Sequence, residues 1–145
     1  MYRLDARGIY AAEAWKGGIM KIVVLAGGIS TERDVSLSSG SMIYAALKKG
    51  GHQAVLLDVY LGYVGNTEGI FEDSVDWAAQ IGAVGEQSPD LEAVRAMRKD
   101  GGKGFFGPNV LEICQSADCV FLALHGANGE DGRIQACFDL LGIPY

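Results

Sequence analysis

The sequence has few cysteines, few prolines and no long hydrophobic run. Its three cysteines, Cys114, Cys119 and Cys137, form neither the even set of a disulfide-rich secreted domain nor a CxxC metal pair, so we expect reduced, buried thiols. No apolar run approaches the roughly 18 residues of a membrane span. The first 20 residues carry five charged side chains instead of an apolar signal-peptide core. These absences predict a cytoplasmic protein without a membrane partner.

Positively charged residues are also scarce. The chain has 145 residues, with 12 Lys and Arg against 18 Asp and Glu, a formal net charge of −6, and no run of basic side chains. Nucleic-acid binding depends on clustered positive charge, so no nucleic-acid partner is expected. Hydrophobic residues make up 49% of the chain and charged residues 21%, which is enough apolar material for the core of one domain.

The first 19 residues differ from the remainder of the chain. They have mixed charge and weak periodicity, whereas the strongest strand pattern begins directly after Met20. We therefore expect residues 1–19 to be a leader or an added extension, in which Tyr10, Ala11 and Trp15 are candidates for a short helix. The folded domain is expected to span residues 20–145.

Residues 20–60 have the pattern of a strand, a glycine turn, a helix and a second strand. Residues 21–26 (KIVVLA) form an apolar, β-branched run that stops at two glycines, and residues 52–60 supply another apolar run. Between them, apolar and small residues recur at helical spacing from Val35 onward, and Thr31 and Asp34 have the spacing of a capping box. A strand–helix–strand unit requires a parallel sheet, so the sequence predicts the α/β class.

Residues 61–108 contain no long apolar strand and are expected to be an insertion between core elements. Two helices are predicted within this segment, one at residues 73–81 and one that starts at Ser88-Pro89-Asp90 and ends before residue 99. The core pattern then resumes with a helix at 109–115, a strand at 119–124, a loop at 126–132, a helix at 134–141 and the opening of a further strand at 143–145.

Two loops follow the carboxyl ends of predicted parallel strands, where such sheets bind ligands. Residues 27–34 follow the first strand and residues 125–131 follow the third, so we expect both loops to face one site. Glu32 could bind an ammonium group there, or it could be an acid favoured by the helix dipole. His125 could be a ligand contact or a hydrogen-bonded histidine at a strand end. The glycine spacing is not GxGxxG, and Glu32 and Asp34 would repel a phosphate, so this turn suits an amine better than a nucleotide.

Two separated motifs resemble the N-terminal domain of D-alanine–D-alanine ligases, members of the ATP-grasp superfamily. The motifs are GG-x-S-x-ER-x-VS-x-x-SG at residues 27–40 and ALHG-x-x-GEDG-x-IQ at residues 123–135. The resemblance covers about residues 20–60 and 109–145 and has the motifs in the order of that family. It implies a three-layer, Rossmann-like parallel-sheet domain of the kind that precedes an ATP-grasp domain, with an insertion at about 61–108.

The resemblance also implies a function. In this family the N-terminal domain holds the first D-alanine, while a central and a C-terminal domain bind ATP, Mg²⁺ or Mn²⁺ and the second D-alanine. ATP phosphorylates the carboxylate of the first D-alanine, and the amine of the second attacks the acylphosphate in a step of peptidoglycan synthesis. Glu32 is similar to the family's catalytic residue near the first ammonium group, Val35 to the residue that packs against the methyl group, and His125 to the histidine near the carboxylate.

The resemblance leaves alternatives open. The implied parent is a cytoplasmic, homodimeric ligase of cell-wall biogenesis that maintains cell shape. The 145 residues alone, without the central and C-terminal domains, are expected to bind neither ATP nor a metal and to be inactive. The chain could instead be a stand-alone amino-acid-binding or dimerising module, or part of a ligase that joins D-alanine to D-lactate or D-serine.

Overall fold

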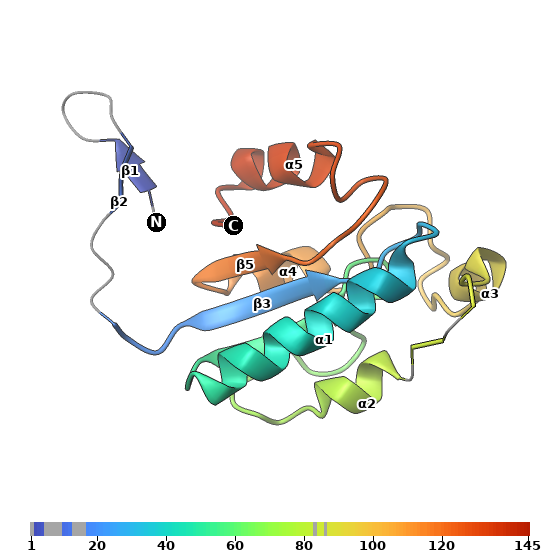
Figure 1. The fold of residues 1–145 in the computed structure, drawn as a ribbon, viewed down its shortest axis with the longest axis horizontal. Helices are drawn as coiled ribbons and strands as arrows, with labels where there is room; N and C mark the ends of the chain where they lie inside the picture. The colour runs from blue at the N-terminus through green and yellow to red at the C-terminus, as the bar shows by residue number, and fades with distance from the viewer. Residues whose placement is uncertain (1, 5–9, 13–16, 83, 86) are drawn as a thin grey trace.

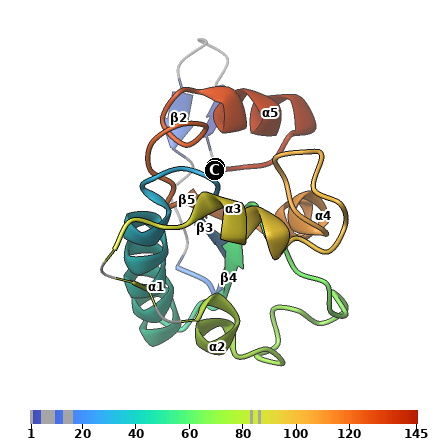
Figure 2. The same ribbon diagram turned by 90° about the vertical axis from the view of Figure 1, so that its right-hand side faces the viewer.

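The core of the domain is a parallel sheet between two layers of helices. A computed structural model describes residues 2–4, 10–12, 17–82, 84–85 and 87–145. The parallel sheet has the strand order β4-β3-β5 and is built from β3 (Lys21–Ala26), β4 (Gln53–Asp58) and β5 (Cys119–Leu122). Helices lie on both faces of this sheet, as the two views in Figure 1 and Figure 2 show. The predicted α/β class with a three-layer parallel sheet is therefore confirmed.

The central strand β3 is apolar on both of its faces. Val23 pairs with Val55 of β4 on one side and with Val120 of β5 on the other, and all three side chains are at most 1% exposed. Because helices cover both faces, this strand lacks the alternation of polar and apolar residues that a half-exposed strand would have. The unbroken KIVVLA run in the sequence reflects this double burial.

Helix α1 (Arg33–Lys49) packs along one face of the sheet, and α4 (Val110–Gln115) lies on the opposite face (Figure 2). The buried side of α1 includes Ser36, Leu37 and Gly40. Helix α5 (Arg133–Leu141) follows β5 and buries Ile134 and Phe138. The predicted capping box at the start of α1 is wrong, because the N-cap residue is Glu32 instead of Thr31 and its side chain makes no capping bond.

Residues 61–108, the connecting segment, contain α2 (Trp77–Ile81) and α3 (Leu91–Ala96). Both helices are shorter than predicted and start at an aspartate that accepts backbone hydrogen bonds, Asp76 for α2 and Asp90 for α3. The predicted start of this helix at Ser88 is therefore two residues too early, because the N-cap is Asp90. Asp90 holds that position because its carboxylate accepts bonds from the N–H groups of residues 92 and 93.

The two ends of the connecting segment are joined by a backbone clasp. The Gly107 N–H donates to the Val59 carbonyl (2.9 Å), and the Tyr63 N–H donates to the Pro108 carbonyl (2.9 Å). Gly62 lies so close to Pro108 that a β-carbon at position 62 would overlap the proline backbone. The segment therefore leaves and re-enters the core at one point beside the carboxyl end of β4.

The remaining elements lie at the two ends of the chain. β1 (Tyr2–Leu4) and β2 (Tyr10–Ala12) form an antiparallel pair, so the predicted helix at Tyr10 and Ala11 is wrong, while Trp15 and residues 1, 5–9, 13, 14 and 16 of the expected leader lie outside the described residues. At the other end, the Val120 N–H donates to the Pro144 carbonyl (2.8 Å), although no strand is assigned to residues 143–145. In the part of the chain that the structure describes, no helix is long and apolar enough to cross a membrane.

Candidate functional site

The loops that follow β3 and β5 meet at the carboxyl edge of the sheet. The Ser30 hydroxyl donates to the His125 carbonyl (3.3 Å), which ties one loop to the other. The carboxylate of Glu32 lies against the α-carbon of Gly126, where a β-carbon would collide with it. The two loops therefore lie together at this edge, as expected, while their common ligand site stays a prediction. Gly126 has a φ of 73°, a conformation that residues with a side chain rarely adopt, so glycine is favoured at this position.

Glu32 stands at the N-terminus of α1 with an exposed side chain. Its backbone N–H donates to the Ser30 hydroxyl (3.2 Å), while its carboxylate forms no capping bond. The carboxylate points across to Gly126 of the other loop instead of back to its own helix. This position leaves its charge available to a ligand between the two loops.

His125 is half-buried directly after the buried residues Ala123 and Leu124. Its carbonyl is held by Ser30, whereas its imidazole has no hydrogen-bond partner among the residues that the structure describes. The interpretation of His125 as a hydrogen-bonded histidine at a strand end thus has no support from its side-chain contacts. The Ser30 contact and the closeness of Glu32 to Gly126 place His125 in the same part of the domain as Glu32.

The two acids of the GEDG motif shape the loop that carries His125. Glu130 accepts a hydrogen bond from the Gly126 N–H (2.9 Å), and Asp131 accepts one from the Asn128 N–H (3.0 Å). The bond from Asn128, together with one from the Arg133 N–H, holds the pKa of the Asp131 carboxyl below its ordinary value. Both carboxylates are therefore occupied by loop backbone.

Val35 lies one helical turn beyond Glu32, and its side chain is 55% exposed. It lines a groove of about 460 Å³ between the first half of α1 and residues 84, 85 and 87–89, together with Thr31 and Asp34. The structure thus brings Glu32 close to His125, whereas it places Val35 on the adjoining surface of α1.

A buried ion pair that the sequence reasoning missed lies beneath the glycine turn. Arg33 and Asp58 pair with each other and are each 6% exposed. Arg33 also donates to the Gly28 carbonyl (2.7 Å), and Asp58 accepts hydrogen bonds from the N–H groups of Tyr60 (2.9 Å) and Leu61 (3.1 Å). The pair joins the turn after β3 to the end of β4. The signal for it was an aspartate at the end of an otherwise apolar strand.

Gly27 reaches its conformation because it lacks a side chain. Its φ is 78°, and a β-carbon there would lie 2.7 Å from the Asp58 carboxyl carbon. Its N–H donates to the hydroxyl of Ser36 (2.9 Å), which in turn donates to the Ala123 carbonyl (2.6 Å). Ser36 is another residue of the site that the sequence reasoning did not assign, although it belongs to the first motif.

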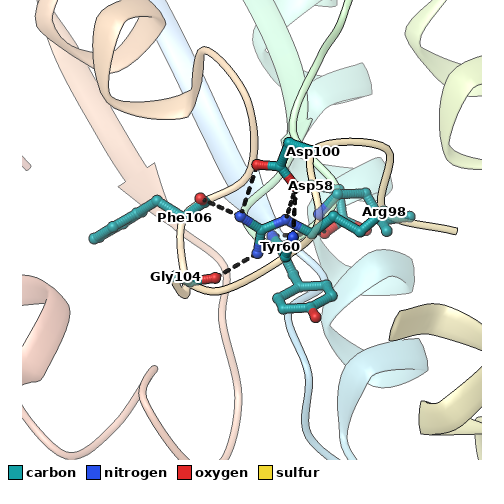
Figure 3. Close-up of polar contacts among 8 residues, drawn as sticks. Asp58, Tyr60, Arg98, Asp100, Gly104 and Phe106 are labelled. Atoms are coloured by element: carbon teal, nitrogen blue, oxygen red, sulfur yellow. Dashed lines mark hydrogen bonds and ion pairs between the residues drawn. The ribbon is translucent and has the colours of Figure 1, made fainter. Parts of the chain in front are cut away.

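Arg98 organises the part of the connecting segment that lies beside the end of β4 (Figure 3). Its guanidinium lies 4.7 Å from the centre of the Tyr60 ring, pairs with Asp100 (2.9 Å), and donates to the carbonyls of Gly104 and Phe106. The hydrogen bonds from Arg98, and then that from the backbone N–H of residue 102, hold the pKa of the Asp100 carboxyl below its ordinary value. Since Tyr60 also donates to Asp58, this cluster adjoins the buried pair beneath the glycine turn.

The described residues offer no evident metal centre and no activated thiol. No group of three or more His, Cys, Asp or Glu side chains is placed to hold a metal among them. All three cysteines are free, and burial raises the pKa of the Cys114 thiol to about 12 and that of Cys119 above its ordinary value. A thiol with a raised pKa is a poor nucleophile, and the expected burial is confirmed for Cys114, whereas Cys119 and Cys137 are only half-buried.

A family model and several similar proteins match this chain, and they agree with each other. The family model described as "D-ala D-ala ligase N-terminus" matches residues 21–145. The D-alanine–D-alanine ligase of Lacticaseibacillus casei strain BL23 is 49% identical over 129 residues, covering 87% of this chain and 36% of the relative. The enzyme of the same name from Pediococcus pentosaceus is 47% identical over 133 residues, with the same coverage. That from Halalkalibacterium halodurans is 36% identical over 126 residues, covering 87% of this chain and 27% of the relative. The chain thus spans about a third of the length of these relatives.

Proposed function

Since the chain belongs to the D-ala D-ala ligase N-terminus family, we propose that it forms the part of an ATP-dependent D-alanine–D-alanine ligase that binds the first D-alanine. One observation carries this proposal: the two strand-end loops touch, so that the Glu32 carboxylate lies against Gly126, the neighbour of His125. An amino-acid zwitterion needs an anion for its ammonium group and a hydrogen-bond donor for its carboxylate. The two loops supply one of each.

The proposed roles follow from the charges of the side chains. Glu32 binds the ammonium group of the first D-alanine, and the His125 imidazole donates to its carboxylate. Val35, three residues beyond Glu32 on the adjoining surface of α1, contacts the methyl group. Once the site closes around the ligand, exclusion of water strengthens both charged contacts.

A nucleotide does not suit the residues present at this site. Glu32 and Asp34 stand at the start of α1, where a bound phosphate would meet two negative charges instead of free N–H groups alone. Glu130 and Asp131, the acids of the other loop, are engaged by backbone. We therefore assign to this chain the binding of the amino acid, and we assign ATP and its Mg²⁺ or Mn²⁺ to other parts of the proposed ligase.

The proposed ligase is a cytoplasmic enzyme of peptidoglycan synthesis that works as a homodimer. The test is phosphate release from ATP and Mg²⁺ in the presence of D-alanine, D-lactate or D-serine. It is made with the 145-residue chain and with the protein encoded by the complete reading frame. We expect release and D-alanyl-D-alanine formation by the longer protein and none by the 145 residues. If the longer protein releases no phosphate with any of these substrates, an amino-acid-binding or dimerising module would be favoured. A product that contains D-lactate or D-serine would reassign the second substrate.

The role of Glu32 is tested by Glu32→Gln in the longer protein, with Glu68→Gln as a control at an exposed glutamate of the connecting segment. Loss of a charged hydrogen bond to the ammonium group should raise the apparent KM for the first D-alanine by about tenfold to a hundredfold. The KM for ATP should stay unchanged in both variants. Equal kinetics of the two variants would refute the proposed role of Glu32.

A further inference from the structure

Two serines connect the loops of the site, and neither has a role in the contacts proposed so far. Ser36, on the first turn of α1, is fully buried. Its hydroxyl accepts the Gly27 N–H (2.9 Å) and donates to the Ala123 carbonyl (2.6 Å). It therefore links the residue that follows β3 to the residue that follows β5.

Ser30 makes the same kind of link between the two loops, at residues farther along the chain from the ends of β3 and β5. Its hydroxyl accepts the Glu32 N–H (3.2 Å) and donates to the His125 carbonyl (3.3 Å). The two residues that it joins are those proposed to hold the ammonium group and the carboxylate of the substrate. We call Ser30 and Ser36 together the serine bridge.

The serine bridge begins where the sheet stops holding the two strands together. Among the described residues, the last backbone hydrogen bond between the ends of β3 and β5 runs from the Ala123 N–H to the Leu25 carbonyl (2.9 Å). Beyond this bond the two chains diverge into loops, and a hydroxyl can span them because it is both a donor and an acceptor. Both hydroxyls are engaged by backbone on two sides, so they serve to hold the loops instead of binding a ligand.

We propose that Ser30 and Ser36 are positioning residues that set the separation of the Glu32 carboxylate and the His125 imidazole, and thereby restrict the site to an α-amino acid. This inference rests on the proposed function, because it concerns the same site. A fixed separation between the anion and the donor selects the distance between the ammonium group and the carboxylate of the zwitterion, which is one carbon longer in a β-amino acid than in an α-amino acid. Without the bridge, the loops would separate and tolerate a longer zwitterion.

The kinetic test uses Ser30→Ala and Ser36→Ala in the protein encoded by the complete reading frame. The control is Ser41→Ala on the same helix, whose hydroxyl donates only to the Leu37 carbonyl of α1 (2.8 Å). Misplacement of a binding group should raise the KM for the first D-alanine by about tenfold to a hundredfold, with the KM for ATP unchanged. The preference for D-alanine over β-alanine should fall in both bridge variants and not in the control.

Ser30→Thr provides a rescue, because it keeps the hydroxyl at a half-buried position. It should retain the wild-type preference, whereas Ser30→Ala should lose it. If Ser36→Ala fails to fold, Ser30→Ala decides the question, since its hydroxyl is only partly buried. Unchanged substrate preference in Ser30→Ala would overturn the proposal, as would an equal change in Ser41→Ala.

Amide NMR spectra of the 145-residue chain separate this inference from the proposed function. Ser36→Ala should speed hydrogen exchange at the Gly27 N–H and also shift the amide signals of residues 125–131. A change confined to Gly27 would overturn the coupling of the two loops even if the longer protein is an active ligase. A longer protein without ligase activity would overturn the proposed function, while these spectra would still decide whether the bridge couples the loops.

Discussion

Replacing Asp58 by asparagine should destabilise the domain far more than the same replacement at an exposed aspartate. Asp58 and Arg33 are each 6% exposed, and removal of one partner from a buried ion pair costs about 3–5 kcal/mol. Asparagine keeps an oxygen that can accept the N–H groups of Tyr60 and Leu61, so we expect a loss of about 3 kcal/mol, at the low end of that range.

Asp58→Ala should cost more, because it also removes the acceptor for those two N–H groups. Each lost backbone hydrogen bond adds about 1 kcal/mol, which gives a total of about 5 kcal/mol. A domain of this kind is stable by about 5–15 kcal/mol, so the alanine variant should be partly or wholly unfolded. Arg33→Met combined with Asp58→Asn should be less destabilised than Asp58→Asn alone, because no unpaired guanidinium is left buried.

The measurement is urea denaturation of the 145-residue chain followed by far-UV circular dichroism. The control is Asp73→Asn, which breaks the ion pair of Asp73 with Lys48. These two side chains are 68% and 29% exposed, and such a pair contributes at most about 1 kcal/mol. Equal losses in Asp58→Asn and Asp73→Asn would refute the reasoning. So would a double variant whose loss equals the sum of the Arg33→Met and Asp58→Asn losses.

Three further predictions concern packing, a thiol and the connecting segment. Gly40→Ala should lower the free energy of unfolding by about 1 kcal/mol in urea denaturation. The new β-carbon would lie 2.7 Å from that of Ala26, and this overlap outweighs the gain in helix propensity, so a more stable variant would contradict the prediction. Cys114, with a pKa of about 12, should be about one ten-thousandth thiolate at pH 8 and should resist iodoacetamide until urea unfolds the chain. The stability of the domain should fall as the pH rises from 9 towards 12, since only the thiol of the unfolded chain ionises in this range. Rapid alkylation of the folded chain would refute the burial of Cys114. Arg98→Lys should speed amide hydrogen exchange at residues 100–107, because lysine cannot reproduce the several hydrogen bonds of the guanidinium. In the wild type, the contribution of the Asp100–Arg98 pair to stability should be lost as the pH falls below 3.8. Unchanged exchange in the variant would contradict the role of Arg98.

Elements with a strong local pattern were predicted well, and their ends were not. β3 matches its predicted range because both of its faces are buried. β5 ends at Leu122, two residues before the predicted end, since Ala123 and Leu124 are buried but leave the sheet towards the loop. α2 begins at Trp77 instead of residue 73, because Asp73 has a positive φ of 57° and Asp76 caps the helix. The spacing of apolar residues does not show at which residue a capping side chain starts or ends a helix.

The candidate site was predicted in outline, and its supporting contacts were not. The meeting of the two loops followed from strand order, because adjacent parallel strands end at the same edge of a sheet. The partners of Arg33 and Ser36 lie 25 and 87 residues away in the sequence. A spacing rule cannot identify contacts over such separations. The serines and the arginine stood in the recognised motif, but only the folded chain shows that they bind backbone and a buried carboxylate.

The backbone clasp at Gly62 and Gly107 brings the two ends of the connecting segment together. Ile70, Phe71 and Trp77 of this segment belong to the buried core, but its exposed stretches can gain or lose residues without altering the separation of β4 and α4. Selection on the length of this segment can therefore act independently of selection on the sheet. The same property makes it the place at which a reporter domain can be spliced into the chain while the loops around Glu32 and His125 keep their spacing.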